Sequence, residues 1–193
     1  DNDHPGFQVI SAGTLIRVKG FGLAIKCFKR FVDKYPDADL TIVGSGPEES
    51  RLRGLVRRSN LQSKVQFLPA IPRDELLRKL QSHDVFLFPS LRDGGAAVVV
   101  EAMAAGKPVV CLDTGGPDMH VTEQCGVKIP AVSHQQAVRD LADALERLYL
   151  DQGLRLKQGR AARQRAQEMY HWDRLGERLM EIYRRALPAE RGD

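Results

Sequence analysis

The sequence contains no apolar run that approaches the roughly 18 consecutive residues a membrane-spanning helix needs. It has only three cysteines, Cys27, Cys111 and Cys125, and no C-x-x-C pair. This odd count predicts buried free thiols rather than disulfides or a zinc site. The five histidines show no metal-ligand spacing with one another or with the cysteines. Four are expected to be structural or surface residues, and His120, which follows a glycine-rich loop, is the one functional candidate among them. These absences argue against an integral membrane protein, a disulfide-stabilised domain and a zinc module.

Three widespread nucleotide-binding and catalytic motifs are also missing. No G-x-G-x-x-G follows the first predicted strand, and the chain contains no G-x-x-x-x-G-K-[ST]. Ser90 lacks the G-x-S-x-G context of a hydrolase nucleophile. The dinucleotide-binding, P-loop and hydrolase classes therefore lose their main support.

Positive charge is concentrated near the end of the chain. The net charge is +4, and residues 151–193 hold ten lysines and arginines against seven acids. One run contains no acid between its five cations, which are Arg155, Lys157, Arg160, Arg163 and Arg165. This pattern is typical of a solvated helix face, and an anionic partner is the alternative. Nucleic-acid modules interleave aromatic residues with such charge, and this run has none, so we expect no nucleic-acid partner.

Short apolar runs rich in β-branched residues alternate with segments of helical period. An apolar content of 42% and a length of 193 residues fit one ordinary α/β domain. The predicted strands are Phe7–Ala12, Asp39–Val43, Val65–Leu68, Val85–Phe88, Pro108–Leu112 and Val127–Ile129. Because these strands are almost continuously apolar, both faces of the sheet must be covered by helices. The pattern predicts a Rossmann-like α/β fold with a doubly wound parallel sheet.

The predicted helices separate these strands and then continue alone. They are residues 21–35, Glu48–Arg58, Arg73–Gln81, Ala96–Ala105, Ser133–Leu150 and Asp151–Tyr170, followed by an amphipathic helix from Trp172 that Pro188 ends. The first should stop near Tyr35, since a residue before proline disfavours the α conformation.

The loops that follow the strands are rich in glycine and proline. They are residues 13–20, 44–47, 69–72, 89–95 and 113–117. Open parallel sheets bind ligands at the carboxyl ends of their strands, and glycine lets a ligand approach the backbone closely. These loops therefore predict a polar ligand-binding edge suited to a nucleotide or phosphate.

Three charged residues stand out along this edge. Asp93 precedes two glycines and a predicted helix and is a candidate N-cap, while the free amides at the start of that helix are a candidate anion-binding site. Glu101 is the only charge between Asp93 and Lys107, in an otherwise apolar helix. Its carboxylate needs hydrogen-bond donors, which an arginine or vicinal ligand hydroxyls would supply. Lys19, in the first loop, is either a surface lysine or a phosphate contact.

From about Val9 to Leu187, the chain resembles the carboxy-terminal, donor-binding domain of the retaining GT-B glycosyltransferases of the large group 1 family. The signature of this family is matched by Asp93, Glu101 and the residues 102–110 that follow. The other matching motifs are Gly13-Thr14-Leu15 with Lys19-Gly20, the Val43-Gly44-Ser45-Gly46-Pro47 turn, the segment Asp84–Ser90, the Gly115-Gly116 turn, and the helix from Trp172 to Tyr183. The resemblance implies the carboxy-terminal half of a GT-B fold.

The resemblance implies roles for individual residues. Glu101 would bind the ribose hydroxyls of a nucleotide diphosphate sugar, Asp93 would bind hydroxyls of the transferred sugar, and Lys19 would balance charge on the leaving diphosphate. The remaining donor-site residues would be Gly13, Thr14, Arg17, Gly44, Ile71, Gly94, Gly95, Ala96, Ala97, Gly115 and Gly116. Family members use no essential metal, so we expect neither metal nor cofactor.

The chain departs from the family pattern in three respects. Thr14 stands where arginine is usual, and Arg17 is a candidate substitute for the missing cation. Asp93 stands where glutamate is commoner and is followed by a bulkier Ala96, and Met119 replaces a common glutamate. The alternative to a transferase is therefore a non-catalytic nucleotide-binding or regulatory domain. A sugar-nucleotide epimerase of the same architecture is disfavoured by the spacing of Asp93 and Glu101.

The resemblance also predicts an organisation for the parent protein. Residues 1–6 would be a linker remnant, 7–170 the donor-binding domain, 171–187 a crossover helix and 188–193 a tail. The partners would be a nucleotide diphosphate sugar and an amino-terminal acceptor domain, in a cytoplasmic protein with peripheral contact to the inner membrane face as an open alternative. We expect this chain alone to bind donor without transferring sugar.

Overall fold

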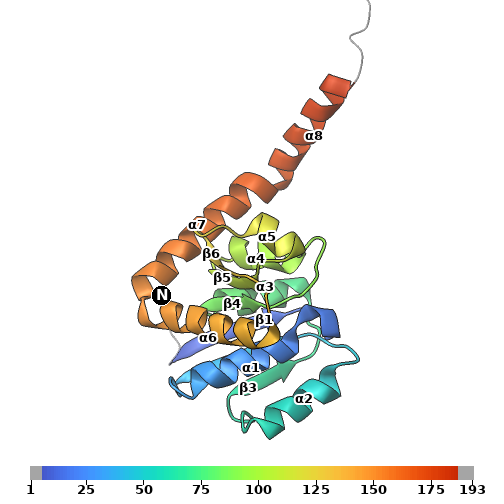
Figure 1. Ribbon diagram of the computed structural model, residues 1–193. Helices are drawn as coiled ribbons and strands as arrows, with labels where there is room; N and C mark the ends of the chain where they lie inside the picture. Colours follow the sequence, from blue (N-terminus) through green and yellow to red (C-terminus); the bar gives the residue numbers. More distant parts are fainter. Residues whose placement is uncertain (1–5, 187–193) are drawn as a thin grey trace, which may run out of the picture.

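The computed structural model describes residues 6–186 and contains one six-stranded parallel sheet (Figure 1). Its strands lie in the order β3-β2-β1-β4-β5-β6. They are β1 (Phe7–Ala12), β2 (Ala38–Val43), β3 (Val65–Leu68), β4 (Val85–Phe88), β5 (Val109–Leu112) and β6 (Gly126–Ile129). The strand order reverses between β1 and β4, where Val9 pairs with Val85. The predicted Rossmann-like, doubly wound sheet is therefore confirmed, with its switch point at β1 and β4.

Helices cover both faces of this sheet. They are α1 (Phe21–Val32), α2 (Glu49–Arg58), α3 (Arg73–Gln81), α4 (Ala97–Ala104), α5 (Gly115–His120), α6 (His134–Leu150), α7 (Gln152–Tyr170) and α8 (Trp172–Ala186). Buried side chains of α1, α2 and α6 form the core on one face, and those of α3, α4 and α7 form it on the other. Successive strand residues alternate between the two cores, as Val9 and Ile10 do.

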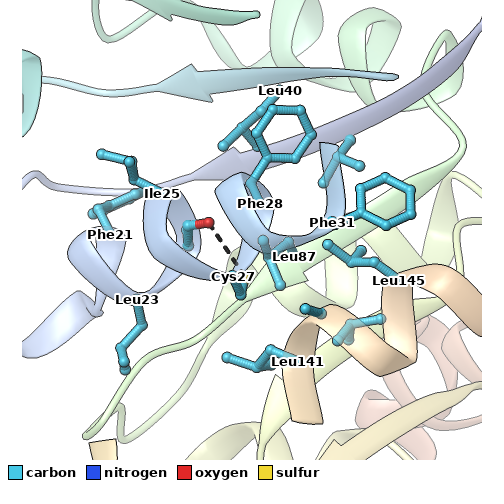
Figure 2. Packing of buried hydrophobic residues seen from close by; sticks show 14 of the residues in the cluster. Phe21, Leu23, Ile25, Cys27, Phe28, Phe31, Leu40, Leu87, Leu141 and Leu145 are labelled. Carbon is cyan, nitrogen blue, oxygen red and sulfur yellow. Dashed lines mark hydrogen bonds between the residues drawn. The ribbon is translucent and has the colours of Figure 1, made fainter. Parts of the chain in front are cut away.

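The larger core is built around α1, whose apolar residues recur at helical spacing. Figure 2 shows Phe28 of α1 directed toward Leu40 of β2, with Leu141 and Leu145 of α6 along another side of the helix. Phe28 is fully buried, and its ring centroid lies 6.2 Å from that of Phe31. Burying such a side chain contributes about 1.5–3 kcal/mol to folding. The stripe of apolar residues on α1 therefore anchors the helix between the sheet and α6.

All three cysteines are free and buried, as the sequence predicts. Burial raises the pKa of the Cys27 thiol to about 12, and burial likewise raises the pKa of Cys111 to about 12. A buried thiol with a raised pKa carries almost no reactive thiolate at neutral pH. These side chains act as small apolar core residues.

Most predicted elements are present, and several begin one residue away from the predicted position. The helices predicted from Ser133 and Asp151 begin one residue later, because these side chains act as N-caps that accept hydrogen bonds from the amides of Gln136 and Leu154. The predicted strand at Pro108 likewise begins at Val109. The first helix ends at Val32, before Tyr35.

Two segments predicted as loops contain short helices. Arg17–Lys19 forms one 3-10 turn, and Gly115–His120 forms α5. The loop predicted over residues 113–117 was wrong from Gly115 onward. Two glycines and a proline are typical of a turn, whereas here Gly115 adopts a φ of +57° and a six-residue helix begins at it. Pro188, Leu187 and the predicted tail 188–193 lie outside the described residues, as does 1–5 of the predicted linker.

The last two helices form a long arm. Figure 1 shows α7 crossing the body and α8 continuing away from it. No residue of α8 is buried, and its large exposed apolar side chains are Trp172, Leu175, Leu179, Met180, Ile182 and Tyr183. Among the described helices, none is long and apolar enough to cross a membrane.

We predict that Phe28→Ala lowers the free energy of unfolding by about 3–5 kcal/mol, because the cavity left in the α1 core cannot be refilled. Urea unfolding followed by circular dichroism measures this change. Leu156→Ala is the control, since Leu156 is 49% exposed and its truncation should change stability by less than about 1 kcal/mol. Equal losses in the two variants would contradict the assigned core.

Candidate functional site

A pocket of about 240 Å³ opens at the carboxyl edge of the sheet, beside the ends of β1, β2 and β3. Five of its lining residues are predicted site residues, namely Gly13, Thr14, Gly44, Ile71 and Glu101. The others are Ala12, Val43, Ser45, Ala70, Leu76 and Val98. The pocket is therefore mainly apolar and backbone-lined, with one carboxylate, which suits a flat ring joined to a polyol.

The floor of this pocket depends on close contact between two loops. A Cβ on Gly44 would lie 1.9 Å from the carbonyl oxygen of Gly13, so no larger residue fits. The Leu15 amide donates to the Ser45 carbonyl at 3.0 Å, and the Glu48 amide donates to the Leu15 carbonyl at 2.9 Å. These bonds hold the loops after β1 and β2 in one rigid unit.

Glu101 lies on α4 at the wall of the pocket, and its side chain is 20% exposed. Arg73, at the start of α3, donates from Nε to Oε1 of Glu101 at 2.8 Å. The second carboxylate oxygen, Oε2, accepts no hydrogen bond from any residue between 6 and 186. The sequence analysis named two possible donors to Glu101, an arginine and the vicinal hydroxyls of a ligand. The site accommodates both, because Arg73 occupies one carboxylate oxygen and leaves the other for a ligand.

Lys19 and Asp93 form an ion pair close to the end of β4. Nζ of Lys19 contacts Oδ2 of Asp93, and the Lys19 ammonium also lies 5.8 Å from the centre of the Phe88 ring. The side chains are only 22% and 11% exposed. Two residues that are 74 positions apart are therefore brought together as a shielded pair.

Asp93 also organises the loop before α4. Its Oδ1 accepts hydrogen bonds from the amides of Ala96, at 2.8 Å, and Gly95, at 3.2 Å. Burial alone raises the pKa of Asp93, but the Lys19 ammonium and these two amides outweigh it, so the net pKa is lowered. The residue remains a carboxylate at neutral pH.

The start of α4 differs from the simple N-cap arrangement. Asp93 does not cap α4; the N-cap is Ala96, which adopts a left-handed conformation with φ +41°. The amides of Gly95 and Ala96 are occupied by Asp93, whereas those of Ala97 and Val98 have no hydrogen-bond acceptor in the described part of the chain. The free amides at this helix end therefore begin at Ala97, on the side of the loop that carries Gly94 and Gly95.

The glycine pair after β5 packs directly against this loop. The Gly116 amide donates to the Asp93 carbonyl at 2.6 Å, and a Cβ on Gly115 would approach that carbonyl oxygen to 2.6 Å. The predicted residues Gly94, Gly95, Ala96, Ala97, Gly115 and Gly116 thus form a second cluster with Lys19 and Asp93.

Arg17 lies apart from both clusters. Its side chain is 85% exposed and faces Glu48 at 3.7 Å. It lines a different groove with Lys26 and Arg51. Arg17 was a candidate substitute for the arginine that is usual at the position of Thr14. The structure does not bring the Arg17 side chain together with Thr14.

The predicted donor-site residues did not include Arg73 or Ser45, and His120 was a candidate without an assigned role. Arg73 pairs with Glu101, Ser45 accepts a hydrogen bond from the Ala70 amide at 3.1 Å, and His120 contacts Gly95. Arg73 had a usable signal, because it opens the helix that follows β3 on the ligand-binding edge. Within the described residues, no group of three or more histidine, cysteine or carboxylate side chains could hold a metal ion.

Comparison with known proteins identifies relatives of this chain. The family described as glycosyl transferases group 1 matches residues 2–165. A D-inositol 3-phosphate glycosyltransferase of Pseudarthrobacter chlorophenolicus is 35% identical over 189 residues, covering 95% of this chain and 44% of the relative. The chain thus spans less than half the length of this relative.

Two solved structures have the same fold. The pneumococcal O-GlcNAc transferase GtfA, solved with UDP and GlcNAc, superposes with a TM-score of 0.84 at 20% identity, covering 97% of this chain and 38% of that one. The C-terminal domain of a group 1 glycosyl transferase, LpcC from Francisella tularensis, superposes with a TM-score of 0.77 at 22% identity, covering 87% of this chain and 88% of that one. The latter shows that such a domain exists as a separate structure.

We predict that Asp93→Asn destabilises the fold by about 1.5 kcal/mol at pH 7, because it removes a charged partner from Lys19. The lowered pKa of Asp93 gives stability that is present above its unfolded value of about 3.9 and is lost as the pH falls through the folded value. The difference between wild type and variant should therefore shrink below about pH 4. Urea unfolding from pH 7 to pH 2.5 measures it, with the exposed Asp143→Asn as control. A difference that is constant over this range would contradict the ion pair.

Proposed function

Because this chain belongs to the group 1 glycosyltransferases, we propose that it binds a nucleotide diphosphate sugar and presents the sugar for transfer to an acceptor with retention of configuration. The main support is the geometry of two adjacent clusters. One is an apolar pocket that contains a single carboxylate, Glu101, and the other is the shielded pair of Lys19 and Asp93.

The pocket fits the nucleoside part of such a donor. Backbone and apolar side chains around Gly44 and Ile71 would border the base. Oε2 of Glu101, which has no partner in residues 6–186, would accept hydrogen bonds from the ribose hydroxyls. Arg73 would hold the carboxylate in place through Oε1.

The second cluster would hold the diphosphate and the sugar. Lys19 would bind the diphosphate, and the free amides at the start of α4 would add hydrogen bonds to it. Asp93 would accept hydrogen bonds from sugar hydroxyls. Lys19 and the amides would therefore neutralise the leaving diphosphate without a metal ion or cofactor.

The proposed reaction exchanges one bond at the anomeric carbon for another. The bond to the diphosphate oxygen breaks and its electron pair leaves with the diphosphate. A bond to an acceptor hydroxyl oxygen forms, and the hydroxyl proton is released. Lys19 favours this step because its positive charge is fixed where negative charge develops.

The acceptor would be bound by a second domain. The chain spans 44% of the length of the Pseudarthrobacter relative, and α8 exposes a continuous apolar face. An amino-terminal domain of the parent protein would cover this face and form the other wall of the cleft. The buried thiols fit a reducing, cytoplasmic compartment. Alone, the chain would bind donor without transferring sugar.

A non-catalytic nucleotide-binding domain is the alternative function. Thr14 adds no charge to the pocket, and Arg17 faces Glu48 instead of the site. Such a domain would bind nucleotide through Glu101 but would not transfer sugar even with its partner domain present.

The first test is nucleotide binding. We predict that UDP, GDP or ADP binds with a Kd below about 1 mM, and that Glu101→Ala weakens this binding by about 1.5–3 kcal/mol. Isothermal titration calorimetry measures both values, with the exposed Glu168→Ala as control. Absence of binding by all three nucleotides would refute the donor site. If Arg73→Ala weakens nucleotide binding as much as Glu101→Ala does, the Glu101 carboxylate contributes to affinity only by its pairing with Arg73.

The second test separates phosphate from nucleoside contacts. We predict that Lys19→Ala weakens binding of the diphosphate at least tenfold while changing the affinity for the matching nucleoside less than twofold, since only the diphosphate carries the charge that Lys19 would meet. Competition titrations with UDP and uridine, or GDP and guanosine, measure the ratio. Circular dichroism confirms that the variant is folded, and equal losses for both ligands would contradict a phosphate contact.

A further inference from the structure

His120 joins the loop 93–97 to the carboxyl-terminal end of α7. It is the last residue of α5, and its ring makes two hydrogen bonds in opposite directions. Nε2 lies 2.8 Å from the carbonyl oxygen of Gly95, and Nδ1 lies 2.7 Å from the hydroxyl of Tyr170. Residues 25 and 50 positions away along the chain are thus linked through one side chain.

The two partners select one tautomer of the neutral ring. A carbonyl oxygen can only accept, so Nε2 must carry the hydrogen that Gly95 receives. In the neutral ring Nδ1 is then an acceptor, and it takes the hydroxyl hydrogen of Tyr170. The rings of His120 and Tyr170 also meet edge to face, with centroids 5.0 Å apart. One tautomer therefore satisfies both contacts.

Tyr170 stands at the joint between the last two helices. It ends α7, His171 has the extended backbone angles φ −65° and ψ 138°, and α8 begins at Trp172. The direction of α8 is therefore decided within two residues of the His120 contact. Figure 1 shows α5 lying beside α4, below the end of α7 from which α8 departs.

Other bonds keep α5 from moving independently. Arg165 of α7 donates from Nε to the His120 carbonyl at 2.7 Å and from Nη2 to the Met119 carbonyl at 3.2 Å. At the other end of α5, the Gly116 amide is bound to Asp93. The short helix is thus fastened to α7 at one end and to the donor-site loop at the other.

We propose that His120 is a positioning residue that holds the Gly95 carbonyl, and through it the loop 93–97, and that ties this loop to the α7–α8 joint through Tyr170. This role rests on the proposed donor site. When donor occupies the loop, the displacement of Gly95 is transmitted to Tyr170 and changes the surroundings of α8. The arm that would meet the acceptor domain thereby senses the state of the donor site.

Trp172 gives a direct readout of the joint. It is the only tryptophan in the chain, it lies two residues from Tyr170, and it is 84% exposed. We expect UDP or GDP, whichever binds, to shift the Trp172 emission of the wild-type chain. At saturating nucleotide, Tyr170→Phe should lose this shift, while the control Tyr183→Phe, on α8, should keep it. A wild-type chain that binds nucleotide without any change in Trp172 emission would overturn the coupling.

His120 variants test the positioning role. His120→Ala should raise the nucleotide Kd about fivefold and remove the emission shift, because it removes both bonds. His120→Gln keeps a side-chain N–H near the position of Nε2, so it should restore most of the affinity without restoring the shift. The exposed His134→Ala is the control. Unchanged affinity and emission in His120→Ala would refute the role.

Hydrogen exchange distinguishes failure of this inference from failure of the donor site. Without nucleotide, the amides of Gly95 and Ala96, which donate to Asp93, should exchange faster in His120→Ala than in wild type, whereas those of β1 and β2 should not. If the wild-type chain binds no nucleotide, the proposed function fails, and the exchange rates alone decide the link between His120 and the loop. Unchanged exchange at Gly95 and Ala96 would overturn it.

Discussion

All six strands of this sheet run in the same direction, and the location of every candidate functional group follows from that arrangement. Parallel strands require a crossover after each strand, and here helices on both faces supply it. The carboxyl ends of the strands consequently meet at one edge, where the loops after β1, β2 and β3 surround a pocket. The core formed by α1 and α6 keeps these loops at fixed positions. The site is thus a property of the whole sheet, since no single loop supplies both clusters.

Charge within the site is balanced before any ligand enters. Lys19 is neutralised by Asp93, and Asp93 is held in turn by two backbone amides, so neither charge is left buried without a partner. A diphosphate would compete with a carboxylate for the same ammonium, while the carboxylate would keep its amide donors. The proposed donor site would therefore exchange one ion pair for another, which limits the desolvation that binding costs. Glu101 follows the same logic, since Arg73 satisfies one oxygen and leaves the second unbound.

The strands and the long helices could be predicted from the sequence because they depend on local patterns, whereas most residues assigned to the two clusters came from the resemblance to a known family. Apolar periodicity predicted α1, and glycine content predicted the ligand-binding edge. The side-chain pairs could not be predicted in the same way. Arg73 meets Glu101 across 28 positions and His120 meets Gly95 across 25, and such contacts depend on how α3, α4 and α5 pack. Helix α5 was missed because its glycines satisfy a tight contact with Asp93 that local propensity does not register.

The three buried thiols have a practical consequence for studying the arm formed by α7 and α8. Because Cys27, Cys111 and Cys125 are enclosed in the core, the native chain presents no accessible thiol to a maleimide reagent within residues 6–186. A single cysteine introduced on the exposed surface of α8 would therefore be labelled selectively, without removal of the native ones. A second cysteine introduced on the exposed surface of the sheet domain would complete a fluorophore or spin-label pair, so the distance between α8 and that domain could be measured while the native core stays unaltered.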